Sequence, residues 1–393
     1  FMEQSACAFE AARTLGRGPW SAFFSVALPL ARPSIVAGAS LVLMETVADF
    51  GAVDYFAVDT LATGIYRTWL GSGSLTVAAQ LAACLLGFVA LLLIVEQLAR
   101  RGVRYHGATS RHRESHAVRL GALAQVGAMT LCALPVLLGF GIPLAFFANL
   151  AIRFGDQRAT ELFIDHGGNT LLVALIAAIA AVTLAVVLAY AQRLHRTLLT
   201  HGAARLAGMG YAVPGTVVAV GLLIPLGALD RSINASIASI WGTSAMPGLI
   251  FTGSIAAIIL GYQARFLAVA LGLVDAGLGR IRHSLDDAAR TLGASRFRVL
   301  RAVHLPLLRK SVLLAMLLVF VDVIKELPAT LILRPFNFET LAVRVYQLAS
   351  DERLDEAATG ALAIMLIGLI PTIALTSLVG PRQETTPAGA TPL

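Results

Sequence analysis

Eight long apolar stretches constrain this chain more than any other feature of its sequence. A helix that crosses the hydrocarbon core of a bilayer needs about 20 predominantly apolar residues, and within lipid the backbone must satisfy its own hydrogen bonds. The sequence therefore predicts an all-α, polytopic membrane protein. The expected spans are residues 35–53, 75–95, 120–140, 171–191, 206–226, 248–269, 312–331 and 357–378.

The composition supports embedding in a lipid bilayer and excludes other classes of protein. Of the 393 residues, 57% are hydrophobic and 13% charged, against about 25% charged in an ordinary soluble domain. The net charge of +7 comes from residues scattered between apolar runs, so we expect no nucleic-acid partner. The three cysteines form no CxxC pair, which argues against a thiolate metal site.

The distribution of Lys and Arg predicts which ends of the spans face the cytoplasm. Of the 30 basic residues, 21 fall on one side of the expected spans and seven on the other. Cytoplasmic loops carry the excess of Lys and Arg, so the side with 21 is assigned to the cytoplasm. Nine of these, including Arg265, are assigned to the last cytoplasmic loop.

One segment of the chain is repeated at an offset of 277 residues. Residues 10–36 align with residues 287–313, and 12 of the 27 positions are identical. One core reads EAARTLG and the other DAARTLG, and both copies then reach V-x-L-P-L at the same distance. Agreement in order and spacing indicates an internal duplication.

The repeat also predicts the domain organisation. Copy two follows four expected spans and precedes two, whereas copy one precedes two and follows none, so we expect four further spans upstream in the intact protein. The chain would then comprise the end of a first transmembrane domain (1–97), a basic cytoplasmic linker (98–119), a second six-span domain (120–379) with its loop at about 287–306, and a tail (380–393).

Each copy predicts a short helix ended by glycine, a bend, a second helix and a proline that begins the next span. This loop resembles the EAA signature of the permeases of binding-protein-dependent ABC importers, in which the loop forms a coupling helix that docks on the ATPase. Copy two departs from the signature by having Asp in place of Glu. The resemblance implies two docking sites, made by Glu10, Ala11, Ala12 and Gly16 and by Asp287, Ala288, Ala289 and Gly293.

Packing must contribute to such docking as well as charge. An exposed ion pair contributes about 0 to 1 kcal/mol, whereas shifting a two-state transporter from 1:99 to 99:1 requires about 5.5 kcal/mol of differential binding. Apolar side chains are therefore expected to contact the ATPase or, alternatively, to anchor the loop among lipid headgroups. They are Leu15, Trp20 and Phe23 in copy one, and Leu292, Phe297 and Leu300 in copy two.

The sequence predicts a transport subunit rather than an enzyme. A P-loop needs G-x-x-x-x-G-K-[ST], and the two lysines, Lys310 and Lys325, follow Arg309 and Ile324. By resemblance, ATP and Mg²⁺ bind to a separate ATPase dimer on the cytoplasmic face, and this chain holds no cofactor or metal. The eight histidines show no metal-ligand spacing, and most are expected at the surface or the membrane interface.

Four acidic residues lie within the expected spans that follow the two loops, at matching positions in the two copies. Glu45 and Asp49 align with Asp322 and Glu326, and each pair is four residues apart on one helix face. A charge at the bilayer centre costs about 2.5 to 3.5 kcal/mol, and carboxylates suit hard cations. The four are candidates to line a polar pathway. The alternative is structural pairing, as between Asp322 and Lys325.

The region after copy two resembles the ferric-iron permeases of this family, over FVDVIKELPATL (320–331), RPFNFETLA (334–342) and residues 346–353. The resemblance implies a bacterial inner-membrane protein that imports ferric iron, delivered by a periplasmic iron-binding protein docking on residues 334–356. The alternative for these residues is a structured lid. Thiamine permeases share the fused layout, so thiamine or another small solute is the alternative cargo. An ion-coupled secondary transporter fits the repeat and the acids, but it does not explain the doubled loop.

Overall fold

The computed structural model describes residues 6–100, 121–154, 159–195, 197–243 and 247–379, and every regular element in these ranges is helical. The predicted all-α class is thereby confirmed. The chain divides into two compact units, one made of residues 1–150 with 212–221 and the other of residues 151–211 with 222–393. The predicted tail, and the predicted linker beyond residue 100, lie outside the described residues.

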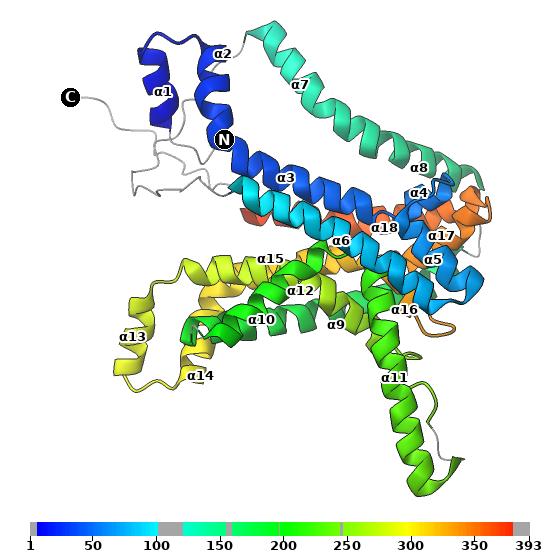
Figure 1. Ribbon diagram of the computed structural model, residues 1–393. Coiled ribbons are helices and arrows are strands. Elements are labelled where there is room, and N and C mark those ends of the chain that lie inside the picture. Colours follow the sequence, from blue (N-terminus) through cyan, green and yellow to red (C-terminus); the bar gives the residue numbers. More distant parts are fainter. Residues whose placement is uncertain (1–5, 101–120, 155–158, 196, 244–246, 380–393) are drawn as a thin grey trace. The chain divides into compact units, whose positions relative to one another are not determined.

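The first unit is built around α6, against which α3 and α5 pack. Ile65 of α5 and Leu85 of α6 are buried in the cluster that joins these helices. Thr60 caps α5 through reciprocal hydrogen bonds with Thr63. The helices of this part of the chain are α1 (Ala6–Thr14), α2 (Pro19–Ala22), η1 (Phe23–Ala27), α3 (Leu28–Ala48), α4 (Gly51–Tyr55), α5 (Leu61–Ser72), α6 (Leu75–Arg100), α7 (Ala122–Val136), η2 (Leu137–Gly141) and α8 (Ile142–Phe154) (Figure 1).

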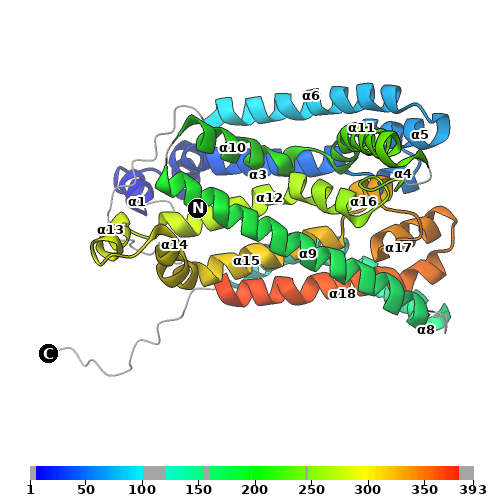
Figure 2. The ribbon, with the colours of Figure 1, turned by 90° about the horizontal axis from the view of Figure 1, so that it is seen from below.

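Helices α9, α12 and α15 form the centre of the second unit, where each packs against the other two. Helix α10 packs on α9 and α12, and α17 packs on α18 and α9. The remaining helices are α9 (Ala159–Leu194), α10 (Leu198–Met209), η3 (Gly210–Ala212), α11 (Gly215–Trp241), α12 (Ile255–Gly279), α13 (His283–Thr291), α14 (Arg296–Val299), η5 (Leu300–His304), α15 (Leu305–Ile324), α16 (Pro328–Leu333), α17 (Leu341–Ser350) and α18 (Leu354–Val379) (Figure 2).

Most of the predicted spans correspond to long apolar helices. Six helices in the described ranges are long and apolar enough to cross a membrane. The bent pair Pro19–Arg32 and Ser34–Ala48, whose halves meet at 61°, adds a seventh span when it is counted as one. The predicted span at residues 312–331 corresponds to α15 and α16, which are not among these spans. Within the described ranges, the six helices long and apolar enough to cross a membrane are Leu75–Glu96, Ala122–Phe154, Ile164–Leu194, Gly215–Trp241, Ile255–Gly279 and Leu354–Ile373.

The predicted span at residues 206–226 is wrong as a continuous helix. Helix α10 ends at Met209, and α11 begins at Gly215. The residue just before α11, Pro214, has no N–H to donate to a helix. At the break, a Cβ on Gly210 would lie 1.9 Å from the carbonyl oxygen of Ala264 in α12. Glycine is therefore required for α10 to pack this closely on α12.

The predicted span at residues 312–331 is also divided. Helix α15 ends at Ile324, and the short helix α16 begins at Pro328. Pro328 has no N–H to donate to a preceding carbonyl, so α15 does not continue through it and a turn separates the two helices.

Candidate coupling loops and the groups that position them

The two copies of the repeat have the same succession of helices. The bounds of α1, α2 and η1 lie 277 residues before those of α13, α14 and η5, and the starts of α3 and α15 are related by the same offset. In each copy a π-helical turn precedes the Leu-Pro pair, where proline cannot supply the hydrogen bond of a regular helix. Figure 1 shows each succession, from a short helix through a bend into a long helix. The duplication therefore extends to the backbone conformation.

A glycine ends the first helix of each loop in the same way. Gly16 and Gly293 have φ values of 84° and 80°, in the left-handed region that favours glycine. The N–H of Gly293 donates to the Arg290 carbonyl at 3.0 Å, and the next N–H donates to the Ala289 carbonyl at 3.1 Å. Copy one has the same two bonds, to Arg13 and Ala12. This is a Schellman motif, and it fixes the angle at which the second helix leaves.

The residues predicted to contact the ATPase lie mainly on exposed surface. The side chains of Leu15 and Leu292 are 83% and 88% exposed, and Trp20 and Phe297 are 74% and 71% exposed. Phe23 and Leu300 are half-buried. This exposure places an apolar side chain at the tip of each bend, where a partner subunit can reach it.

The polar and small residues of the two signatures have mixed environments. Glu10 and Asp287 are exposed, and neither carboxylate pairs with another residue in the described part of the chain. Ala11 and Ala288 are exposed, Ala12 is buried and Ala289 is half-buried. The assignment of these residues and of the two glycines to ATPase docking remains a prediction.

An ionic cluster that the sequence did not predict ties the copy-two loop to α9. Arg193 donates from Nε to Asp286 Oδ2 at 2.7 Å, and from Nη1 and Nη2 to the carbonyls of Leu278 and Ile281 at 2.7 and 2.9 Å. Asp286 also faces His304, whose Nε2 lies 2.7 Å from Oδ1. We name Arg193, Asp286 and His304 the loop clasp.

His304 departs from the expectation that most histidines lie at the surface or the membrane interface. Its side chain is fully buried, against the ring of Tyr190 at 5.5 Å between centroids. Burial lowers the pKa of His304, although the carboxylate of Asp286 opposes this effect. Sequence reasoning missed Asp286 because it aligned the neighbouring Asp287 with Glu10. The available signal was that two acids, not one, precede the second Ala-Ala.

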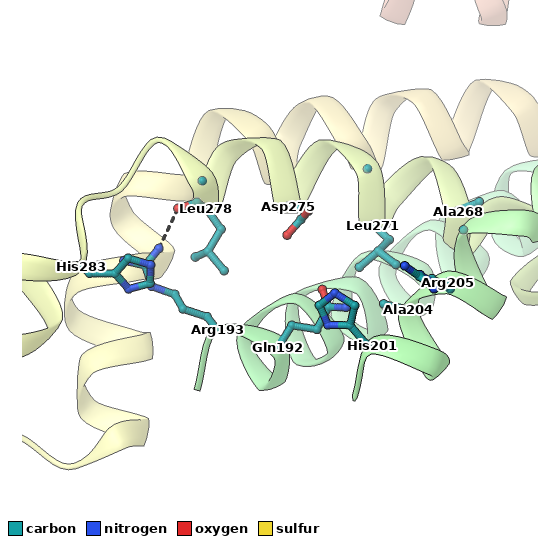
Figure 3. Close-up of a pocket in the computed structure, with 13 residues that line it drawn as sticks. Gln192, Arg193, His201, Ala204, Arg205, Ala268, Leu271, Asp275, Leu278 and His283 are labelled. Atoms are coloured by element: carbon teal, nitrogen blue, oxygen red, sulfur yellow. Dashed lines mark hydrogen bonds between the residues drawn. The ribbon is translucent and has the colours of Figure 1, made fainter. Parts of the chain in front are cut away.

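A cavity of about 680 Å³ lies beside the loop clasp, lined by residues of α9, α10 and α12 together with His283. Figure 3 shows Asp275 projecting into it from α12, with Gln192 and His201 on the opposite wall. Arg193 and Arg205 also line the cavity, so its wall carries both signs of charge. Arg193 thus contributes both to the cavity wall and to the position of the loop.

Arg265 was wrongly assigned to the last cytoplasmic loop. It lies within α12, one of the candidate spans, and is 5% exposed. Its Nη1 forms an ion pair with Oε2 of Glu326, which is 7% exposed. Oε1 of Glu326 accepts the backbone N–H of Ala329 at 3.2 Å. The Glu326 side chain therefore closes the turn before α16 and neutralises a buried cation.

The other three candidate pathway acids have different surroundings. Lys325 Nζ lies 3.0 Å from Asp322 Oδ1, which is the contact that the structural-pairing alternative predicted. Asp49 is half-buried and Glu45 exposed. Their role in a pathway remains a prediction. Among the described residues, no group of three or more His, Cys, Asp or Glu is arranged to hold a metal ion.

Glu339 organises the opposite end of the second unit. It accepts a hydrogen bond from Gln347 at 3.0 Å, contacts His166 Nε2 at 3.1 Å and pairs with Arg334 at 3.2 Å. Burial raises the pKa of Glu339, but the hydrogen bonds and the charge of Arg334 outweigh burial and hold this pKa below its usual value. The carboxylate is therefore ionised at neutral pH and fastens the segment before α17.

We expect the contribution of Glu339 to stability to depend on pH. Because its pKa is lowered by folding, the contribution is present above the ordinary value of 4.5 and is lost as pH falls through the lower folded value. Thermal unfolding of wild type and Glu339→Gln in detergent should therefore differ at pH 7 and converge as the pH falls below 4.5. A constant difference between the two proteins across this range would contradict the assignment.

Comparison with known proteins identifies the class to which this geometry belongs. Residues 8–105 and 181–384 match the family described as "Binding-protein-dependent transport system inner membrane component". The chain belongs to this family, the membrane permeases of ABC importers, and is a multi-pass protein of the inner membrane. A crystal structure of a bacterial ABC transporter that imports the acidic polysaccharide alginate has the same fold, with a TM-score of 0.51 at 13% identity, covering 65% of this chain and 96% of that one.

Two curated relatives indicate the range of cargo within the family. The Fe(3+)-transport system permease protein FbpB 2 of Haemophilus influenzae is 25% identical over 371 residues, covering 93% of this chain and 70% of the relative. The molybdenum transport system permease protein ModB of Escherichia coli is 35% identical over 98 residues, covering 23% of this chain and 43% of the relative. The chain spans between 47% and 64% of three further relatives that match most of it.

Proposed function

We propose that this chain is the permease component of an ABC importer that moves ferric iron into the cell. In this proposal a periplasmic binding protein delivers the iron, and a separate ATPase dimer, which binds ATP and Mg²⁺, docks on the two coupling loops. The observation that carries the mechanism is the duplicated loop, whose helix bounds and left-handed glycines agree between the two copies. One chain then offers both contacts that a pair of ATPase subunits needs.

Ferric iron as cargo is supported by the extent of the match. The relative named for Fe(3+) transport aligns along 93% of the chain, whereas the relative named for molybdenum transport aligns along 23%. The acids Glu45 and Asp49 suit a hard cation. Glu326 is a weaker candidate for contact with the cargo, because Arg265 neutralises its charge.

Reconstitution tests the whole proposal. We expect proteoliposomes that contain the full-length permease, its ATPase and its binding protein to accumulate radioactive Fe³⁺ only with ATP. Molybdate and thiamine, each offered in parallel with its own binding protein, should not accumulate. Accumulation of another solute instead of iron would overturn the cargo, and uptake driven by an ion gradient without ATP would overturn the mechanism.

The exposed leucines give a sharper test of the docking sites. Leu15→Asp combined with Leu292→Asp should abolish co-purification of the ATPase, because each aspartate would be desolvated at an apolar contact. The matched control is Leu198→Asp with Leu199→Asp, since these leucines are 95% and 82% exposed and lie outside both loops. Equal loss of the ATPase in the control would show that the effect is not specific to the loops.

A further inference from the structure

Helix α9 holds the copy-two coupling loop at one of its ends. Arg193, in the last turn of α9, makes the three bonds of the loop clasp. One turn earlier, the hydroxyl of Tyr190 donates to the backbone carbonyl of Arg296 at 2.7 Å. Both helices of the loop, α13 through Asp286 and α14 through Arg296, are thus attached to a helix that is not adjacent to them in sequence.

The other end of α9 holds the segment that leads into α17. The side-chain Nδ2 of Asn169 donates to the backbone carbonyl of Glu339 at 3.1 Å, and His166 contacts the Glu339 carboxylate. The hydroxyl of Thr170, which is 2% exposed, accepts the backbone N–H of Leu341 at 2.9 Å. This segment lies in the region predicted to meet the periplasmic binding protein.

Between these two anchors α9 is continuous and tightly packed. It has 36 residues, and Tyr190 follows Thr170 by 20 positions, which corresponds to about 30 Å of helix. Gln263 of α12 donates to the Ala177 carbonyl near the middle of α9 at 3.0 Å. Figure 2 shows α9 running from the α13–α14 end of its unit to the α17 end. Helix α9 packs against α12 and α15, and many of its buried side chains are small, including Ala174, Ala178, Ala181, Ala185 and Ala189.

We propose that α9 is the strut that carries the signal of binding-protein docking to the copy-two coupling loop. This inference rests on the proposed function, because it needs a binding protein at one end and an ATPase at the other. A close-packed helix moves as a unit, since small buried side chains leave little space to deform. A displacement of the segment before α17 is therefore transmitted through Thr170 to the loop clasp.

Copy one lacks the side chains that would make the same attachment. The positions that correspond to Asp286 and His304 are occupied by Phe9 and Ala27. Neither side chain carries a charge or can accept a hydrogen bond from an arginine. The two coupling loops are thus inequivalent, and the strut acts on copy two.

The test measures how much a loaded binding protein stimulates ATP hydrolysis by the reconstituted full-length complex. At the cytoplasmic end, Arg193→Gln and the milder Tyr190→Phe are expected to reduce stimulation at least tenfold and threefold, with basal hydrolysis within twofold of wild type. At the other end, Asn169→Leu with Thr170→Val should reduce stimulation at least threefold. The matched controls Arg205→Gln, in the same cavity, and Thr183→Val, in the middle of α9, should leave stimulation unchanged.

Combining the variants separates a shared path from independent defects. If both anchors serve one strut, variants that carry changes at both ends lose no more stimulation than the more severe single-end variant. The strut would be overturned if the combined variant lost stimulation by the product of the two single-end losses. Full stimulation in Tyr190→Phe and in the Asn169/Thr170 variant would also overturn it. Failure of the wild-type complex to bind or stimulate an ATPase would instead overturn the proposed function. Tyr190→Phe keeps the test valid if Arg193→Gln does not fold, because it removes a single hydrogen bond.

Discussion

Gly293→Pro is expected to reduce ATP-dependent uptake to less than a tenth of the wild-type rate while the protein still inserts and folds. Proline fixes φ near −65°, whereas Gly293 has a φ of 80° and donates its N–H to the Arg290 carbonyl. Both features of the Schellman turn are therefore lost. Helices α13 and α14 would no longer keep the angle that presents Leu292. The ATPase would still bind through the copy-one loop, but it would hydrolyse ATP without driving transport.

Gly242→Pro is the matched control for this experiment. Gly242 also has a left-handed φ, of 88°, and donates its N–H to the Ala238 carbonyl, but it lies after α11, outside both loops. The same backbone conflict should there leave uptake within twofold of wild type. Gly293→Ala should be intermediate, because an L residue in the left-handed region costs about 1 to 2 kcal/mol. Equal losses at Gly242 and Gly293 would show that general folding defects, not the loop, explain the result.

Sequence reasoning predicted correctly those features that depend on residues close together in the chain. The offset of 277 residues located both loops, and the glycine and Leu-Pro positions predicted where the helices turn. These predictions succeed because capping and proline geometry depend on neighbouring residues in the chain. The apolar stretches likewise located most spans, since crossing a bilayer is a requirement on length and composition.

The features that it missed depend on contacts between distant residues. Arg265 was read as a loop residue because arginine is normally cytoplasmic, and its partner Glu326 is 61 positions away. The loop clasp joins Arg193 to Asp286, 93 positions apart. A residue whose partner lies on another helix leaves no periodic signal in the sequence. Two differences between the copies were local signals: copy two has Asp286 where copy one has Phe9, and His304 where copy one has Ala27.

Arg265→Met is expected to destabilise the protein strongly, because it removes one partner of a buried ion pair. Both side chains are nearly inaccessible, at 7% and 8% exposure. Breaking such a pair from one side costs about 3 to 5 kcal/mol, since it leaves an uncompensated buried charge. The midpoint of thermal unfolding in detergent should fall by roughly 5 °C or more. The surface variant Arg353→Gln, which breaks the exposed pair with Glu356, should cost at most about 1 kcal/mol.

Combining Arg265→Met with Glu326→Gln separates the structural role of Glu326 from a role in the pathway. The double variant removes both charges together, and a neutral glutamine oxygen can still accept the N–H of Ala329 that Glu326 now accepts. We therefore expect most of the lost stability to return. If iron uptake returns as well, the carboxylate is not needed by the cargo, and Glu326 serves the turn before α16. If stability returns without uptake, the charge itself acts in transport, and the pathway role predicted for Glu326 from its alignment with Asp49 is supported.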